Sequence, residues 1–296
     1  MLGLSIVILS FNRREALART LSEVRSAEWG RSAQVIVVDN ASSDGSAEMV
    51  RREFPMVELL ALERNTAIAG FNLGAARATR EVVLILDDDS WPREGAMEGA
   101  LAYLESHPEV GGIMLHRRHP RSLAPEWPFD QPDLAGVQTE WPDMGCGNIV
   151  RRGAWNRVGG YEERFHLYRN DTDLALKLLG AGCGVVFNPA WEVWHDSAVV
   201  TRKSNKWLRL STRNWVWMAR RHAAGWPLFK GILLGWLHAH RLAGWRPRGH
   251  WSVLRGLSVG LMRPAPHLPP GLHATPGRFA SLIRLKSRYR APSARS

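Results

Sequence analysis

Short apolar runs alternate with amphipathic stretches along the first part of this chain. The apolar runs predict buried strands, because strands covered on both faces are apolar at every position; they occupy residues 4–9, 35–38, 57–62, 82–86 and 110–115. Helical spacing of apolar residues predicts helices over residues 13–24 and 94–106, and Ser42, Ser43 and Asp44 are candidate caps for a helix that runs through Phe54. Residues 70–78 are rich in small residues and predict a short helix packed close to the sheet. Such alternation with short connections predicts an α/β fold on a mostly parallel, doubly wound sheet.

The pattern changes beyond residue 116. Several prolines and little periodicity predict a loop over residues 117–143, before an extended segment over 141–150. The remaining predicted elements are a helix over 171–179, a strand over 184–189 and helices over 206–223, 228–242 and 250–262. Beyond about residue 265 the chain is rich in Pro and Arg, and we expect it to be loose.

Charge divides the chain near residues 196–205. The net charge is +11, yet nineteen Lys or Arg and no Asp or Glu lie from Ser197 onward, together with seven of the fourteen tryptophans. We therefore predict a catalytic domain over residues 1–204 and a basic, Trp-rich helical region over 205–296. Such a region suits either anionic lipid or nucleic acid, and composition alone leaves both partners open.

Cysteine use and hydropathy favour a cytoplasmic protein. Cys146 and Cys183 lack disulfide-framework or metal-knuckle spacing, so we interpret both as ordinary buried thiols in a reducing compartment. No apolar run approaches the roughly eighteen residues of a membrane span. No signal-peptide pattern begins the sequence.

The strongest candidate for chemistry is a run of three carboxylates, Asp87, Asp88 and Asp89, at the end of the strand predicted over 82–86. Open α/β sheets bind ligands at the carboxyl ends of their strands. Three adjacent carboxylates repel one another, and a divalent cation such as Mg²⁺ or Mn²⁺ relieves that repulsion. The alternative is a solvated acidic turn before Pro92.

Three further residues are candidates on weaker grounds. Asp39 ends the second strand, where it could accept a hydrogen bond from the imide N–H of uracil or thymine, or serve only as a turn residue. Asp171 lies at the start of a helix, where it could act as a general base or only interact favourably with the helix dipole. His195 follows the strand predicted over 184–189, and it could be a manganese ligand or a structural histidine. The glycine signatures of dinucleotide enzymes and P-loop NTPases are absent.

In order and spacing, the motifs of this chain resemble those of the inverting glycosyltransferases of family 2, which have the GT-A fold. The resemblance covers roughly residues 3–200. The matching segments are Ser5–Arg13, Val35–Ser46, Arg64-Asn65, Gly70–Gly74, Leu86–Asp89, Gly147-Asn148, Arg151-Arg152, Gly159–Tyr161, Asn170–Asp173 and Trp194-His195. Arg213-Asn214-Trp215 is similar to a helix motif of the bacterial surface-polysaccharide subgroup, which includes rhamnosyl- and galactofuranosyl-transferases.

The resemblance implies a role for each matched residue. It places in the nucleotide-sugar site the residues Ser10, Asn12, Asp39, Asn72, Asp87 and Asp88, with Asp39 recognising the base. It assigns a divalent metal, Mn or Mg, to Asp87, Asp89 and His195. Asp171 would be the catalytic base, although Asn170 stands where the family usually has an acidic residue.

The expected activity is metal-dependent, inverting transfer of a sugar from a nucleotide-diphosphate sugar to a hydroxyl of a glycan or lipid-linked acceptor, in cell-surface polysaccharide or glycolipid synthesis. We expect a uracil or thymine base, attachment of the basic region to the inner face of the cell membrane, and no nucleic acid partner.

Two alternatives stay open. A sugar nucleotidyltransferase would need a Gly-rich, basic loop after the first strand, where this chain has Ser10-Phe11-Asn12-Arg13. A nucleic-acid-binding protein would use the basic region, in which no recognised module occurs.

Overall fold

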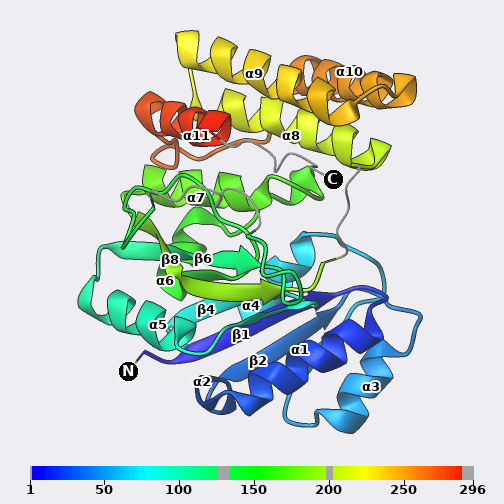
Figure 1. The fold of residues 1–296 in the computed structure, drawn as a ribbon, viewed down its shortest axis with the longest axis vertical. Coiled ribbons are helices and arrows are strands. Elements are labelled where there is room, and N and C mark those ends of the chain that lie inside the picture. The colour runs from blue at the N-terminus through cyan, green and yellow to red at the C-terminus, as the bar shows by residue number, and fades with distance from the viewer. Residues whose placement is uncertain (1, 126–133, 198–202, 289–296) are drawn as a thin grey trace.

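The computed structural model describes residues 2–125, 134–197 and 203–288 of the chain. Within these ranges eight strands form one sheet with the order β3-β2-β1-β4-β7-β6-β8-β5. Helices cover both faces of the sheet, and a further helical layer of α8, α9, α10 and α11 is stacked beyond α7 (Figure 1).

The first four strands of the chain run parallel. β1 (Leu4–Ser10) lies between β2 (Gln34–Asp39) and β4 (Val82–Asp87), and β3 (Glu58–Ala61) pairs with β2. In this register Ser10 lies opposite Asp39, and Leu9 lies opposite Asp87. The carboxyl ends of β1, β2 and β4 therefore meet at one edge of the sheet, which is where open α/β sheets bind ligands.

The other four strands make the sheet mixed. β7 (Asn148–Arg151) is antiparallel to β4 and to β6 (Val110–Arg118). β6 is parallel to β8 (Gly184–His195), which carries β5 (Ser90–Pro92) antiparallel at the sheet edge. The sheet is thus parallel through β1, β2, β3 and β4, as predicted, and it becomes mixed where β5 and β7 pair in the antiparallel direction.

Each face of the sheet has its own apolar core. One core lies beneath α1 (Arg14–Ser26), α3 (Ser46–Glu53) and α5 (Ala96–Ser106); α2 (Glu28–Arg31) follows α1. The other lies beneath α4 (Ala69–Arg77), α6 (Arg152–Val158) and α7 (Asn170–Gly180). Alternation along β1 divides Ile6 and Ile8 from Val7, because successive strand residues face opposite sides.

Helix α4 packs unusually close to the sheet. A Cβ at Gly74 would overlap the side chain of Val7, and one at Gly70 would overlap Leu9. This close approach explains the small residues of the segment, and it confirms the prediction of a short helix packed against the sheet over residues 70–78.

Several boundaries differ from those predicted. The helix predicted to run through Phe54 begins at Ser46 and ends at Glu53, and Asp44, one of its candidate caps, accepts hydrogen bonds from the Ser46 backbone N–H at 3.1 Å and from the Ser46 hydroxyl. Of the extended segment expected over 141–150, the strand β7 is the regular part, and β8 continues well past Pro189. Residues 126–133 of the expected loop lie outside the described residues.

The basic region folds into a helical layer that packs on the sheet-bearing part of the chain. This part lies within residues 2–197, and we call it the catalytic portion after the domain predicted over residues 1–204. It comprises α8 (Asn205–His222), α9 (Gly225–Ala243), α10 (Pro247–Met262) and α11 (Pro276–Arg288). Phe165 and Leu176 of the catalytic portion share a core with Trp215, Trp217 and Phe279. In the described ranges, no helix combines the length and the apolar character needed to cross a membrane.

The expectation of a loose chain beyond about residue 265 is wrong up to residue 288. Phe279 and Leu282 of α11 are fully buried, and Ile283 is nearly so, in the core shared with α8. A Pro- and Arg-rich composition suggested disorder, but these apolar residues, spaced three and four apart, bury one face of α11. Residues 289–296 lie outside the described residues.

Candidate active site

The sheet register brings His195 to the carboxylate run. β4 ends at Asp87, and the following turn enters β5, whose Ser90 lies opposite His195 of β8. The His195 Nε2 atom is 3.3 Å from an Asp89 carboxylate oxygen and 3.8 Å from one of Asp87. Residues about a hundred positions apart in the sequence therefore form one carboxylate–imidazole cluster.

The side chain of Asp87 can be reached by solvent. Its side chain keeps 47% of its surface exposed. Burial among protein atoms nonetheless raises the pKa of Asp87 to about 6, with His195 opposing the rise and Asp89 and Asp171 adding to it. A carboxylate that water can reach, but that is surrounded by other acids, is well suited to bind a cation.

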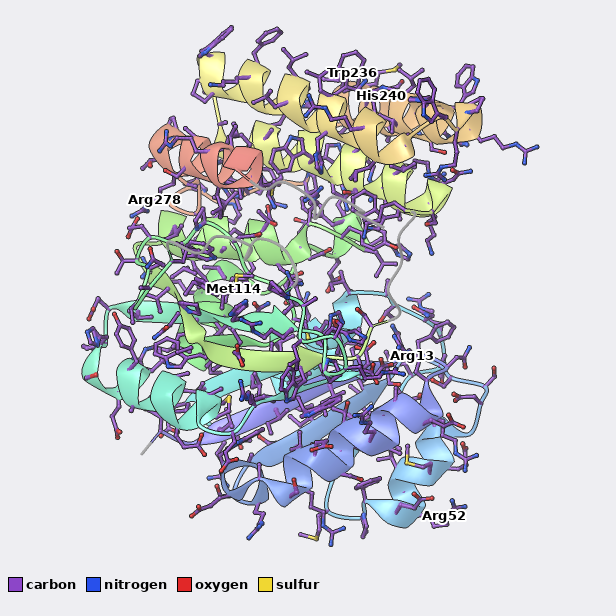
Figure 2. The ribbon with its side chains drawn as sticks, viewed as in Figure 1. Arg13, Arg52, Met114, Trp236, His240 and Arg278 are labelled. Carbon is purple, nitrogen blue, oxygen red and sulfur yellow. The ribbon has the colours of Figure 1, made fainter. Side chains whose placement is uncertain are left out.

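Arg13 neutralises the other two carboxylates. Its guanidinium lies 2.8 Å from an Asp89 oxygen and 3.5 Å from an Asp88 oxygen. Arg13 lies beside the sheet (Figure 2). Burial raises the pKa of Asp88 to about 7 against the pull of Arg13. Burial also acts on Asp89, but the contacts with His195 and Arg13 hold its pKa below the usual value.

The donor set of this cluster fits a hard divalent cation. Ligand atoms of Asp87, Cys146 and His195 all lie within 4.8 Å of one another. Carboxylate oxygen and imidazole nitrogen suit Mn²⁺, whereas the Cys146 thiol is a poor ligand, since burial raises its pKa far above the usual value. The thiol donates a 2.9 Å hydrogen bond to the Ser90 hydroxyl. Cys146, interpreted from the sequence as an ordinary buried thiol, in fact lies against the predicted metal site.

Asp171 opens α7 beside this cluster. Its carboxylate accepts hydrogen bonds from the Tyr161 hydroxyl at 2.7 Å and from the Asn148 amide at 3.1 Å. Burial raises the pKa of Asp171, while these two bonds and the nearby Arg117 oppose the rise. The side chain is thus held in one orientation as a carboxylate of increased basicity, which is what a general base requires.

The loops that follow β1 and β2 are tied together. Asn12, in a left-handed conformation with φ 53°, accepts a 2.7 Å hydrogen bond from the Ser43 N–H and donates its own N–H to Ser42. The Ser42 N–H in turn donates to one Asp39 oxygen at 3.1 Å. The other Asp39 oxygen is buried and has no hydrogen-bond partner among the described residues, so it remains available as an acceptor.

Ser10 and Asn72, two predicted donor-site residues, have different surroundings. Ser10 is buried beside the Asp88 carboxylate. The Asn72 amide exchanges a pair of 2.9 Å hydrogen bonds with the backbone of Tyr161, and it also contacts Glu163 at 3.2 Å. The Asn72 amide therefore positions Tyr161 through these bonds. A donor-binding role for Asn72 stays a prediction.

A strained loop leads into α7. His166, Tyr168 and Arg169 all have positive φ values, between 65° and 71°, which cost free energy for residues other than glycine. The amide of Asn214 on α8 donates hydrogen bonds to the carbonyls of Phe165, Leu167 and Tyr168, at 2.7–3.0 Å. The helical layer therefore fixes the segment that presents Asp171.

A buried ionic cluster joins α7 to α8 as well. Asp173, fully buried, lies 3.1 Å from the His222 ring and 3.5 Å from the Arg221 guanidinium. Asn170 next to it donates to the Glu162 carbonyl, so it holds the first turn of α7 in place of the acid usual in the family. The second acid of the Asn170-Asp171-Thr172-Asp173 motif is thus structural, and Asp171 alone faces the carboxylate–imidazole cluster.

A carboxylate–imidazole cluster thus faces a hydrogen-bonded carboxylate at the carboxyl edge of parallel strands, where open α/β sheets bind their ligands. The family model described as glycosyl transferase family 2 matches residues 5–174, more than half of the chain. The protein belongs to this family, and it is a glycosyltransferase.

Two curated relatives share a quarter of their residues with this chain. An N-acetylglucosaminyl-diphospho-decaprenol L-rhamnosyltransferase of Mycobacterium tuberculosis is 25% identical over 267 residues, which covers 75% of this chain and 86% of that protein. The amylovoran biosynthesis glycosyltransferase AmsE of Erwinia amylovora is 25% identical over 190 residues, which covers 60% of this chain and 70% of that protein.

Solved structures share the fold. The mannosyltransferase PcManGT of Pyrobaculum calidifontis, in complex with GDP-Man and Mn²⁺, aligns with a TM-score of 0.58 at 20% identity, over 97% of this chain and 79% of its own. TarS of S. aureus, residues 1–349, aligns with a TM-score of 0.65 at 12% identity, over 88% of this chain and 81% of its own. Such identities speak to the fold alone, which is the predicted GT-A fold with a helical C-terminal region.

Proposed function

We propose that this glycosyltransferase moves a sugar from a nucleotide-diphosphate donor to a hydroxyl group of an acceptor, with inversion and with a divalent metal. The observation that carries the proposal is the placement of Asp171, whose negative charge lies near enough to Asp87 to raise the pKa of Asp87. One carboxylate thus stands ready to bind a cation while the other, held by Tyr161 and Asn148, stands ready to accept a proton.

The donor would lie along the carboxyl edge of β1, β2 and β4. The unpartnered oxygen of Asp39 suits the imide N–H of uracil or thymine, which is a donor that pairs with a carboxylate. Asp87, Asp89 and His195 would hold Mn²⁺ or Mg²⁺, whose chemistry there is to neutralise charge on the departing nucleoside diphosphate. Ser10, Asn12 and Asp88 would form the nearby part of the donor site.

The transfer step needs one base and no enzyme nucleophile. Asp171 takes the proton of the acceptor hydroxyl as its oxygen bonds to the anomeric carbon. The bond from that carbon to the diphosphate oxygen breaks in the same step, and its electron pair leaves with the nucleoside diphosphate. Attack from the face opposite the leaving group inverts the anomeric configuration.

We also propose a lipid-linked acceptor and attachment to the inner face of the cell membrane, in surface-polysaccharide or glycolipid synthesis. The Mycobacterium tuberculosis relative is named for a diphospho-decaprenol acceptor. On this chain, α9 and α10 form the layer farthest from the sheet (Figure 1). Large exposed apolar residues gather on these two helices and on the turn between them: Trp226, Phe229, Leu233, Leu237, Trp245, Trp251, Leu254, Leu261 and Met262.

Basic residues accompany this apolar surface. A groove of about 780 Å³ between α8 and α10 is lined by Lys206, Arg209 and Arg255, with the exposed Trp251 and Leu254. No acidic residue occurs in the sequence from Ser197 onward to oppose an anionic surface. Apolar side chains beside cations are the combination that binds a membrane containing anionic lipid.

A donor screen tests the proposed activity. Purified protein would be incubated with a panel of nucleotide sugars and Mn²⁺ or Mg²⁺, and transfer and product configuration would be followed by nucleotide release and NMR. We expect Asp171→Asn to lower turnover by at least about a hundredfold with donor affinity kept, the usual scale for a general base.

Glu98→Gln is the matched control, because Glu98 is likewise an acid in the first turn of a helix, α5, away from the site. If Asp171 merely complemented the helix dipole, both variants would keep near-normal rates and lose only a little stability. That result, or a product with retained configuration, would overturn the proposal.

A further inference from the structure

We propose that three cationic side chains beside Asp171 bind the diphosphate group of a diphosphate-linked acceptor, an assignment that rests on the transferase function proposed above. The cationic cluster consists of Arg117 near the end of β6, Arg169 just before α7 and Lys286 on α11. It spans the junction between the catalytic portion and the helical layer.

The three cations converge although they come from distant parts of the sequence. Arg169 and Lys286 share the ring of Trp215, with the guanidinium carbon 5.4 Å and the ammonium nitrogen 5.9 Å from its centroid. Arg169 also donates a 3.0 Å hydrogen bond to the Ser211 hydroxyl. The Arg117 guanidinium lies against the backbone of Gly145 and is close enough to lower the pKa of Lys286.

The positive charges of the cluster contribute to lowered pKa values of neighbouring basic groups. His238 of α9 has a pKa lowered to about 4, by desolvation of its ring among protein atoms and by the positive charges of Arg169, Lys286 and Arg241. Burial likewise lowers the pKa of Lys286 to about 8, against the opposing effect of Asp143. The Lys286 side chain keeps 19% of its surface exposed, so solvent reaches the cationic cluster.

Among the described residues, a carboxylate pairs with Lys286 and none pairs with Arg169. Asp143 lies 3.4 Å from the Lys286 ammonium, and its other oxygen accepts a 2.5 Å hydrogen bond from Thr172. None of the carboxylates in the described ranges forms an ion pair with Arg169, whose guanidinium rests on tryptophan rings and on Ser211. A half-buried guanidinium without an anionic partner is suited to bidentate binding of a phosphate group.

The location of the cluster selects the acceptor rather than the donor. Arg117 and Asp143 both influence the pKa of Asp171, so the cluster begins beside the proposed base. The donor diphosphate is already assigned to the proposed metal site at Asp87 and His195, which leaves the cationic cluster for a second anionic group. An acceptor sugar with its hydroxyl at Asp171 would direct a diphosphate at its own anomeric carbon toward Arg117, Arg169 and Lys286. One diphosphate would then be bound by metal and the other by side chains.

Inorganic pyrophosphate is the direct probe. Its binding to the full-length protein would be measured by calorimetry in EDTA, so that no metal mediates it. We expect the wild type to bind, and Arg169→Gln and Lys286→Gln each to weaken binding by about tenfold or more, the scale of one lost charge-assisted hydrogen bond. Arg169→Lys should restore part of the loss. Arg52→Gln, on the exposed far side of the catalytic portion (Figure 2), is the matched control and should bind as the wild type does.

A kinetic comparison distinguishes this proposal from the proposed function. With the donor found by the screen, the two cluster variants should raise KM for a diphosphate-linked sugar acceptor, and leave donor affinity and KM for the same sugar without diphosphate unchanged. Equal pyrophosphate binding by all variants, no binding by the wild type, or equal KM changes for both acceptors would overturn the assignment. Failure of the wild type to use any nucleotide sugar would instead overturn the proposed function, and the pyrophosphate result would still decide whether the cluster binds diphosphate.

Discussion

The Tyr161 hydroxyl donates a 2.7 Å hydrogen bond to the carboxylate of Asp171. The tyrosine is itself fixed, because Asn72 holds its backbone and its ring packs edge-on against Phe71 and Trp155. Two opposing effects therefore set the basicity of Asp171: burial raises its pKa, and the bond from Tyr161 lowers it.

Tyr161→Phe should shift the acid limb of the rate profile to higher pH. The substitution keeps the ring and removes the hydroxyl that stabilises ionised Asp171, so the pKa of Asp171 rises further. Because the base must be deprotonated, activity is lost as pH falls through that pKa, and the loss would begin at a higher pH. The profile of kcat/KM against pH measures the shift. An unchanged limb, or a shift to lower pH, would contradict the proposed base.

Asp87→Asn should abolish stabilisation by metal without harming the fold. Burial and the neighbouring acids make the charge of Asp87 unfavourable without a cation, so the metal-free variant should melt at the wild-type temperature or slightly above it. Mn²⁺ should raise the melting temperature of the wild type and leave that of the variant unchanged. Thermal melts with and without Mn²⁺ at pH 7.5 provide the comparison, with Asp44→Asn as a control carboxylate outside the cluster. An equal response to Mn²⁺ in both proteins would remove Asp87 from the metal site.

The strand ends of the catalytic portion could be predicted from the sequence because they follow from local patterns. Apolar runs located β1, β2 and β4, and the parallel arrangement then required Ser10, Asp39 and Asp87 to share an edge. Residue type alone left His195 as either a metal ligand or a structural histidine, because its approach to Asp89 depends on the long-range pairing of β5 with β8.

The partners of these residues could not be predicted, because they come from long-range packing. Nothing local indicated that Arg13 would pair with Asp88 and Asp89, or that Cys146 would border the cluster. The charge division near residue 200 suggested a separate attachment region. The charge division gave no indication that Asn214, in the basic region, donates hydrogen bonds to the loop before Asp171.

Asp173→Asn should destabilise the whole protein. Asp173 is fully buried with His222 and Arg221, and removal of its charge leaves Arg221 without one of its two carboxylate partners. Breaking a buried ion pair from one side typically costs about 3–5 kcal/mol. Denaturant unfolding would measure the loss. Asp196→Asn is the control, because the two arginines that pair with Asp196, Arg19 and Arg121, are both exposed, and it should cost clearly less than Asp173→Asn. Comparable losses in the two variants would contradict a role for Asp173 in joining α7 to α8.

Asn214→Ala should lower kcat more than it lowers donor affinity. Without its amide, the carbonyls of Phe165, Leu167 and Tyr168 lose a shared donor, and the strained loop before α7 can relax. Displacement of Asp171 would then slow proton removal, while the donor edge of the sheet stays intact. Steady-state kinetics together with donor binding would show the split. If both quantities fell equally, or neither fell, Asn214 would have no specific effect on the base.

The outer face of α9 and α10 should determine membrane attachment. Trp226, Trp245 and Trp251 are largely exposed there, whereas Trp215 and Trp217 are buried in the core shared with the catalytic portion. Removing the whole helical layer would strip that core and the Asp173 cluster, so point substitutions on the outer face are the cleaner test. Serine at all three exposed tryptophans should weaken co-sedimentation with anionic vesicles by at least about tenfold, since burying one large apolar side chain is worth about 1.5–3 kcal/mol.

Met56→Ser is the matched control for that experiment, because Met56 is an equally exposed apolar residue in the catalytic portion. Binding by the wild type should fall with added salt and with neutral lipid, since each basic residue near an anionic surface contributes about 1 kcal/mol that salt screens. The triple variant should keep its melting temperature and its rate with a short, water-soluble acceptor, because none of the three tryptophans contacts Asp171 or its partners. If the triple variant bound anionic vesicles as tightly as Met56→Ser, the outer face of α9 and α10 would not be the attachment surface.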